Sequence, residues 1–115
     1  MKIEGKSWAN KGGFYGKTQN KSMKSYQQVI TMAKQSDKES QYELGLMYEL
    51  GVGVEKDLKQ AFDWYEKSAN QEHAKAQYNL GIFLALGKGV EKDIRQSKHW
   101  IRRANENGYS GASIF

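Results

Sequence analysis

The sequence predicts an all-α fold, an α/α superhelix (solenoid) of two clear helical hairpin repeats preceded by a degenerate one. Three observations support this prediction: a segment that recurs along the chain, a glycine-rich turn flanked by helix-capping residues, and a stripe of small and aromatic residues at helical spacing. The 115 residues suffice for one short array of repeats and are too few for separate substrate and cofactor domains.

The chain repeats itself with an offset of 36 residues. The string Gln-Tyr-Glu-Leu-Gly at 41–45 returns as Gln-Tyr-Asn-Leu-Gly at 77–81, and Leu-Gly-Val-Gly-Val-Glu-Lys-Asp at 50–57 returns as Leu-Gly-Lys-Gly-Val-Glu-Lys-Asp at 86–93. A tryptophan then follows each second string in the same register. A unit of this length buries its apolar face only by stacking on a neighbour, so the pattern predicts stacked helical hairpins.

The first helix of the first clear repeat is expected over residues 37–50. Ser36 is the predicted N-cap, and Glu39 three residues later completes a capping box. Gly51 supplies the left-handed residue that commonly ends a helix, and Gly53 gives the turn a second position without a Cβ atom. The segment therefore predicts a helix followed by a tight turn.

The second helix of the same repeat is expected over residues 58–71. Asp57 precedes it as the predicted N-cap, since its carboxylate can accept the free backbone N–H groups of the first turn, and Gln60 is placed to reach back. Asp93 and Gln96 repeat this arrangement. Both repeats are thus expected to begin their second helix at an aspartate.

The second helix carries small and aromatic residues at helical spacing, which predicts one buried stripe. We expect this stripe to pack against the neighbouring helices, with two tryptophans buried at equivalent places in the two repeats. The stripe residues are Ala61, Trp64, Tyr65, Ser68 and Ala69, and the equivalent of Trp64 is Trp100.

Weaker traces of the same offset predict a degenerate earlier repeat, with its second helix over residues 22–35. Before it lies a segment rich in glycine and lysine for which the pattern gives no structure. The expected organisation is a basic leader at 1–21 and a repeat domain at 22–115, with repeats at about 37–72 and 73–108 and a C-terminal cap at 109–115.

The net charge of +5 is concentrated near the start of the chain. Residues 1–38 contain eight lysines and two acidic residues, whereas residues 39–115 contain ten basic and eleven acidic residues. There is no cysteine, which excludes disulfides and thiolate sites. Without an apolar run long enough for a signal peptide or a membrane span, the sequence predicts a cytoplasmic protein with no membrane contact.

These repeated motifs resemble the Sel-one-like repeat family, short relatives of the tetratricopeptide repeats. The resemblance covers residues 39–112, and the paired glycines, the capping aspartate and the tryptophan occur in the family's order and spacing. Departures are Glu72, where the family usually has glycine, Leu84 in place of tyrosine and Asn105 in place of alanine. The resemblance implies an α/α superhelix that acts as a protein-binding adaptor, without enzymatic activity and without a cofactor.

The resemblance also implies a binding surface, which we call the inner face, on the first helices of the repeats. Aliphatic and aromatic residues beside charges suit a protein-binding groove. An alternative of equal weight is that its two tyrosines only pack between adjacent repeats. The inner-face residues are Glu39, Tyr42, Leu46 and Glu49 in the first repeat and Lys75, Tyr78, Ile82 and Ala85 in the second.

No residue pattern indicates catalysis or a metal site. His73 and His99, the only histidines, fall on different repeats without ligand-like spacing. The Gly-x-Gly strings at 51–53 and 87–89 follow no predicted strand and lack a Gly-Lys-Ser/Thr signature, so they indicate turns rather than phosphate-binding loops.

The leading hypothesis is a non-enzymatic adaptor of bacterial type whose inner face binds a protein partner, such as a signalling protein or a toxin. In the toxin case the chain would be an immunity protein. The alternative is a nucleic-acid-binding accessory protein that uses the basic N-terminal segment with Trp8, Phe14 and Tyr15. We rate nucleic acid the less favoured partner, and the sequence does not define an oligomeric state.

Overall fold

The computed structural model describes residues 25–109, and this part of the chain contains helices and no strand. The all-α prediction is therefore confirmed for these residues. The expectations for the leader at 1–21 and for most of the cap at 109–115 fall outside the described residues. The helices are α1 (Tyr26–Lys34), α2 (Lys38–Leu50), α3 (Leu58–Ala69), α4 (Ala74–Leu86) and α5 (Ile94–Glu106).

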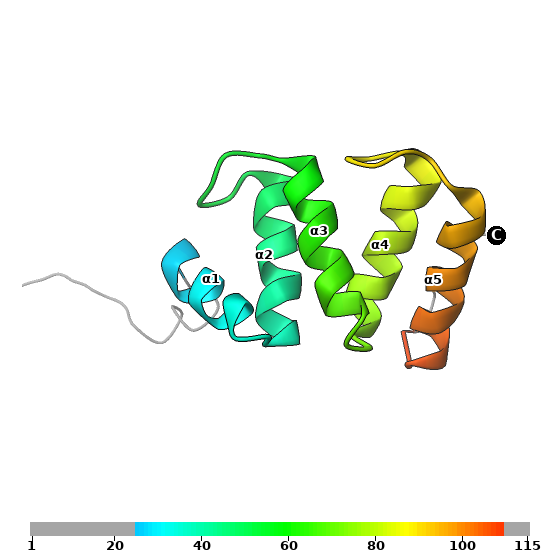
Figure 1. The fold of residues 1–115 in the computed structure, drawn as a ribbon, viewed down its shortest axis with the longest axis horizontal. Coiled ribbons are helices and arrows are strands. Elements are labelled where there is room, and N and C mark those ends of the chain that lie inside the picture. Colours follow the sequence, from blue (N-terminus) through cyan, green and yellow to red (C-terminus); the bar gives the residue numbers. More distant parts are fainter. Residues whose placement is uncertain (1–24, 110–115) are drawn as a thin grey trace, which may run out of the picture.

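Each helix packs on the next one along the chain, so the helices form a single row (Figure 1). Two hairpins, α2 with α3 and α4 with α5, stand side by side and meet where α3 packs on α4. Helix α1 packs on α2 in the place of a second helix from an earlier repeat. The two glycine-rich turns lie at one edge of the row and the short connections between hairpins at the other (Figure 1). This is the predicted solenoid.

The residue that turns the chain between hairpins recurs with the 36-residue offset. Ser36, Glu72 and Gly108 all adopt a left-handed backbone, with φ of 68°, 64° and 92°. Ser36 therefore belongs to the turn, and its prediction as the N-cap of α2 is wrong. Asp37 is the N-cap instead, because its Oδ2 accepts the backbone N–H of Ser40 at 2.9 Å.

The caps predicted for α3 and α5 are confirmed. Asp57 Oδ1 accepts the backbone N–H of Gln60 at 3.1 Å, and Asp93 Oδ1 accepts that of Gln96 at 3.0 Å. The other helix ends differ slightly from the predicted ones, since α1 spans Tyr26–Lys34 and α3 ends at Ala69. The first residues of α3 and α5 could thus be predicted from their capping aspartates, whereas the last residue of α3 was predicted less accurately.

We expect Asp57→Ala to lower the free energy of unfolding by about 1 kcal/mol, because the first turn of α3 loses its side-chain acceptor. Asp93→Ala removes the same contact from α5 and should cost a similar amount. Urea denaturation followed by circular dichroism measures both changes. An unchanged midpoint for Asp57→Ala would refute its capping role.

Tyr65, rather than Trp64, is the central aromatic residue of the core. Tyr65 is fully buried, and its ring meets that of Phe83 edge to face at 5.3 Å. The ring lies directly over Gly45, where a Cβ atom would overlap it. The predicted burial of Trp64 and Trp100 is wrong, since both are only half-buried and pack at the margin of the core.

A buried glutamine joins each first helix to the hairpin before it. Gln77 Nε2 donates to the carbonyl oxygen of Ala69 at 3.1 Å, and Gln77 Oε1 accepts from Asn107 Nδ2 at 2.9 Å. Because an unpaired buried amide is costly, both partners are needed. The earlier repeat has the same arrangement, with Gln41 bound to Ala33 O at 3.2 Å and to Gln71 at 3.0 Å. These hydrogen bonds explain why the repeated motif contains a glutamine.

Glu72, which departs from the family pattern, makes a network that glycine could not. Its carboxylate accepts hydrogen bonds from Asn107, Arg103 and Gln77. These bonds lower the pKa of the Glu72 carboxyl to about 2. The end of the first hairpin is thereby tied to α5 of the second.

The lowered pKa predicts an acid-sensitive contribution to stability. The ionised Glu72 carboxylate stabilises the folded state at pH values above the pKa that this group has in the unfolded chain. This contribution is lost as the pH falls towards the folded-state pKa of about 2. Glu72→Gln should therefore melt below the wild type at neutral pH, and the difference should shrink as the pH approaches 2. Melting temperatures across this range test it, with Glu66→Gln on the exposed side of α3 as control. A difference independent of pH would contradict the network.

Candidate functional site

The inner face is formed where α2 and α4 approach each other on one side of the row. Contacts at both ends of the two helices join them. Glu39 Oε1 lies 3.0 Å from Nε2 of His73 at the start of α4, and Glu49 Oε2 lies 2.9 Å from Nζ of Lys88 just beyond its end. The two helices thus form one continuous surface.

Tyr42 bridges the two repeats near the start of the inner face. Its ring centre lies 4.8 Å from that of His73 and 5.9 Å from that of Tyr65. Burial raises the pKa of the Tyr42 hydroxyl, and the nearby Tyr109 and Glu39 raise it further. The side chain is half-buried, so it packs between repeats and also contributes an edge to the surface.

A polar network that includes Glu49 closes the other end of the inner face. The Tyr65 hydroxyl donates to Glu49 Oε1 at 2.7 Å, and Lys88 Nζ, which also lies over the ring of Phe83, approaches Glu49 Oε2. Burial and the Glu49 carboxylate raise the pKa of Tyr65, which stays protonated. Glu49 therefore joins the two repeats as well as lining the face.

In the second repeat the inner-face residues of α4 pack against α5 and the residues that follow it. Tyr78 stacks on Tyr109 with ring centres 4.7 Å apart, and Tyr78 and Ile82 pack against Ile101. Leu46 and Ala85 are half-buried, whereas Glu39 and Lys75 are exposed. The eight residues of the predicted face thus lie on α2 and α4, and aromatic contacts hold its two tyrosines.

The surface continues to two leucines that are not among the eight predicted residues. Leu50 and Leu86 follow Leu46 and Ile82 by one helical turn and are each 65 % exposed. They occupy equivalent positions in the two repeats, directly before the turn glycines. Their equivalence could be seen from the sequence, but the exposure of their side chains could be determined only from the structure.

The residues considered for chemistry have structural roles. His73 caps α4, since its Nδ1 accepts the backbone N–H of Ala76 at 3.2 Å. His99 is exposed on α5, edge to face with Trp100. Across residues 25–109, no three His, Asp or Glu side chains gather in a way that could hold a metal ion. Gly51 and Gly87 end α2 and α4 in the left-handed conformation.

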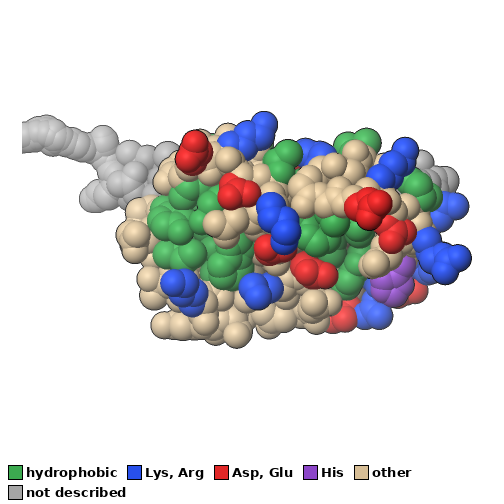
Figure 2. All heavy atoms as spheres, turned by 45° about the horizontal axis from the view of Figure 1, so that its top comes forward, with side chains coloured by type: hydrophobic (Ala, Val, Ile, Leu, Met, Phe, Trp, Pro, Cys, Tyr) green, Lys and Arg blue, Asp and Glu red, His purple; other side chains and the backbone are tan. Residues whose placement is uncertain are grey.

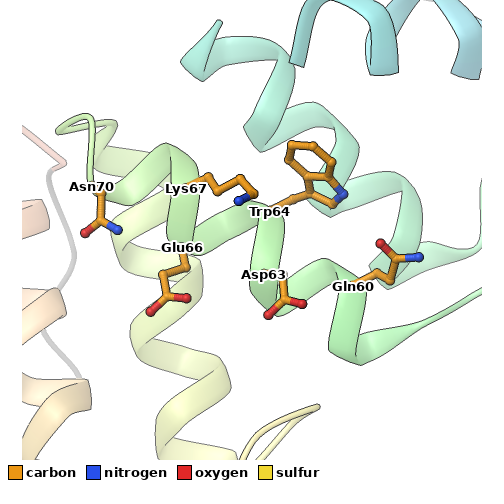
Figure 3. Close-up of a pocket in the computed structure, with 6 residues that line it drawn as sticks. All are labelled: Gln60, Asp63, Trp64, Glu66, Lys67 and Asn70. Carbon is orange, nitrogen blue, oxygen red and sulfur yellow. The ribbon is translucent and has the colours of Figure 1, made fainter. Parts of the chain in front are cut away.

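The outer side of α3 has a shallow recess of about 370 Å³ (Figure 3). Lys67 reaches towards the Trp64 indole, with Nζ 5.8 Å from the ring centre, while the carboxylates of Asp63 and Glu66 point away from it. The residues that line it all belong to α3 and its C-cap, Asn70. Ligand sites draw convergent groups from several elements, so this recess has the character of an open helix surface.

None of the helices in the described part of the chain combines the length and the apolar character needed to cross a membrane.

Comparison with known proteins finds a family model that matches both repeats. The family model of the Sel1 repeat matches residues 38–73 and 74–109. The match gives repeat boundaries one residue later than those predicted. No curated protein matches the chain.

Solved structures show the same fold. A Sel1 repeat protein from Oxalobacter formigenes is 38 % identical with a TM-score of 0.74, and the match covers 75 % of this chain and 35 % of that protein. Helicobacter pylori cysteine rich protein B is 28 % identical with a TM-score of 0.72, over 75 % and 65 % of the two chains. A protective antigen of uropathogenic Escherichia coli is 35 % identical with a TM-score of 0.71, over 75 % and 18 %. The chain thus spans less than two thirds of each of these relatives.

Proposed function

Because the chain belongs to the Sel1 repeat family, whose members are generally protein-interaction scaffolds, we propose that its inner face binds a protein partner. The observation that carries this proposal is the pair of leucines, Leu50 and Leu86, each 65 % exposed at equivalent positions. Exposed apolar side chains that extend a surface of tyrosines and aliphatic residues mark an interaction site more than a solvated one.

The rigidity of the inner face supports the proposal. Tyr42 and Tyr78 are already held by contacts with His73 and Tyr109, so these two side chains would lose little conformational entropy when a partner binds. Glu39 and Lys75 at the margin offer opposite charges that could orient the partner. Packing between repeats and binding are therefore compatible roles for the same tyrosines.

Affinity capture from the native host, followed by mass spectrometry, tests the proposal. The double variant Leu50→Asp/Leu86→Asp should lose a protein that the wild type retains, and its exposed positions should leave the fold intact. The matched control is Gln27→Asp/Met32→Asp, which introduces the same two charges at exposed positions of α1. Equal retention by both double variants would contradict binding on the inner face.

The finer hypotheses stay predictions. A toxin as the partner would make the chain an immunity protein, and capture would identify it. The nucleic-acid alternative depends on residues 1–24, which lie outside the described part of the chain. Its test is a salt titration, since non-specific binding to nucleic acid falls steeply with ionic strength. The cytoplasmic location likewise stays a prediction.

A further inference from the structure

Charge is distributed unevenly along the repeats, between α5 and the residues before it. Helix α5 carries four basic residues against the single acidic Glu106, whereas residues 39–93 carry six lysines against ten acidic residues. The net charge of the repeats is therefore close to zero because the basic charge of α5 offsets the acidic charge of residues 39–93. Figure 2 shows several Lys and Arg side chains near a histidine at the α5 end, with Asp and Glu side chains beside them.

The basic residues of α5 form one exposed stripe. Arg95, Lys98, His99 and Arg102 are spaced three or four residues apart, so they lie on one side of the helix, and all four are exposed. Between residues 25 and 109, Arg95 and Arg102 have no carboxylate in ion-pair contact. Arg103 at the border of the stripe is engaged by Glu72 and Glu106.

The equivalent positions of α3, the second helix of the first repeat, carry charges of both signs. There the positions of Arg95, His99 and Arg102 are occupied by Lys59, Asp63 and Glu66. Lys59 Nζ pairs with Asp63 at 2.8 Å within that helix. Opposite charges four residues apart stabilise a helix, so α3 has a compensation that Arg95 and Arg102 lack within residues 25–109.

We propose that this stripe on α5 is a second docking surface, which binds an acidic segment of a partner protein. The surface lies outside the inner face and does not depend on it. A carboxylate-bearing helix with the same three- and four-residue spacing would place carboxylates opposite Arg95 and Arg102. Arg95 and Arg102 can each bind a carboxylate through two parallel hydrogen bonds.

The size of the stripe favours an acidic polypeptide over nucleic acid. From Arg95 to Arg102 the helix rises about 10 Å. Duplex DNA carries a negative charge about every 1.7 Å, so a bound duplex would extend past the stripe. Most of the charge of the duplex would then lie outside the stripe. A short acidic segment matches the stripe in length.

The test is an NMR titration of the full chain with a synthetic helical peptide that has glutamate at every third or fourth position. Binding should move the side-chain signals of Arg95 and Arg102. Arg95→Glu/Arg102→Glu should weaken the affinity roughly tenfold. The control Lys56→Glu/Lys67→Glu makes the same charge change at exposed positions outside α5 and should alter the affinity less than about twofold.

Two outcomes would overturn the proposal. In the first, the peptide leaves the arginine signals of α5 unmoved, which would place its binding elsewhere, for example on the N-terminal lysines. In the second, a short DNA duplex moves these signals and binds more tightly than the peptide, which would identify the stripe as a nucleic-acid contact. Melting temperatures of all variants verify that each is folded.

Discussion

Tyr65→Ala should lower the free energy of unfolding by about 3–5 kcal/mol, because it empties the centre of the core. The side chain is fully buried, with Phe83 against its edge and Gly45 beneath its ring. A loss of this size is a large fraction of the stability of a small domain. Urea denaturation measures it, and a complete absence of the cooperative transition would agree with the upper end of the range.

Tyr65→Phe separates packing from hydrogen bonding at the same position. The ring stays, and only the hydroxyl that donates to Glu49 is removed, so we expect a loss of about 1 kcal/mol. If Tyr65→Ala cost no more than Tyr65→Phe, the ring would not be the central packing element that the structure indicates.

Gly89→Ala should be the most damaging of the turn substitutions. Gly89 has φ of 65°, and a Cβ atom there would fall on the backbone carbonyl of Leu58, which cannot move without shifting the start of α3. The left-handed backbone alone costs a non-glycine residue about 1–2 kcal/mol. The clash should add about 1–3 kcal/mol, as overpacking does in cores.

Gly53 is the matched control, since it occupies the equivalent turn with φ of 79°. A Cβ atom at Gly53 would meet the flexible end of the Met47 side chain, 2.9 Å away, rather than backbone. Gly53→Ala should therefore show only the conformational cost. Equal losses for the two variants in urea denaturation would mean that the second turn does not pack on α3, and so would contradict the stacking of the hairpins.

The sequence predicted the repeat, its turns and the caps of α3 and α5 because these depend on neighbouring residues. The glycines and Asp57 act within a few positions of themselves, and their 36-residue recurrence excludes coincidence. The cap of α2 was misplaced by one residue because Ser36 and Asp37 are both good capping residues. Only the left-handed backbone of Ser36 decides between them.

The contacts between repeats could not be predicted in the same way. Trp64 and Tyr65 are adjacent on one helix, and periodicity does not resolve which of the two points into the core. Lys88 looked like a turn residue, and its contact with Glu49 joins positions far apart in the sequence. The eight residues of the inner face could be assigned to α2 and α4 from the repeat, whereas the exposure of Leu50 and Leu86 depends on how the chain packs around them.

The central claim is that the surface shared by α2 and α4 receives the partner, and methyl NMR of the full chain with the captured partner tests it most directly. We expect the methyl signals of Leu46, Leu50, Ile82 and Leu86 to shift, while Met32 on α1, away from both proposed surfaces, stays unchanged. Shifts at Met32 or elsewhere, with the four inner-face methyl groups unaffected, would contradict the claim.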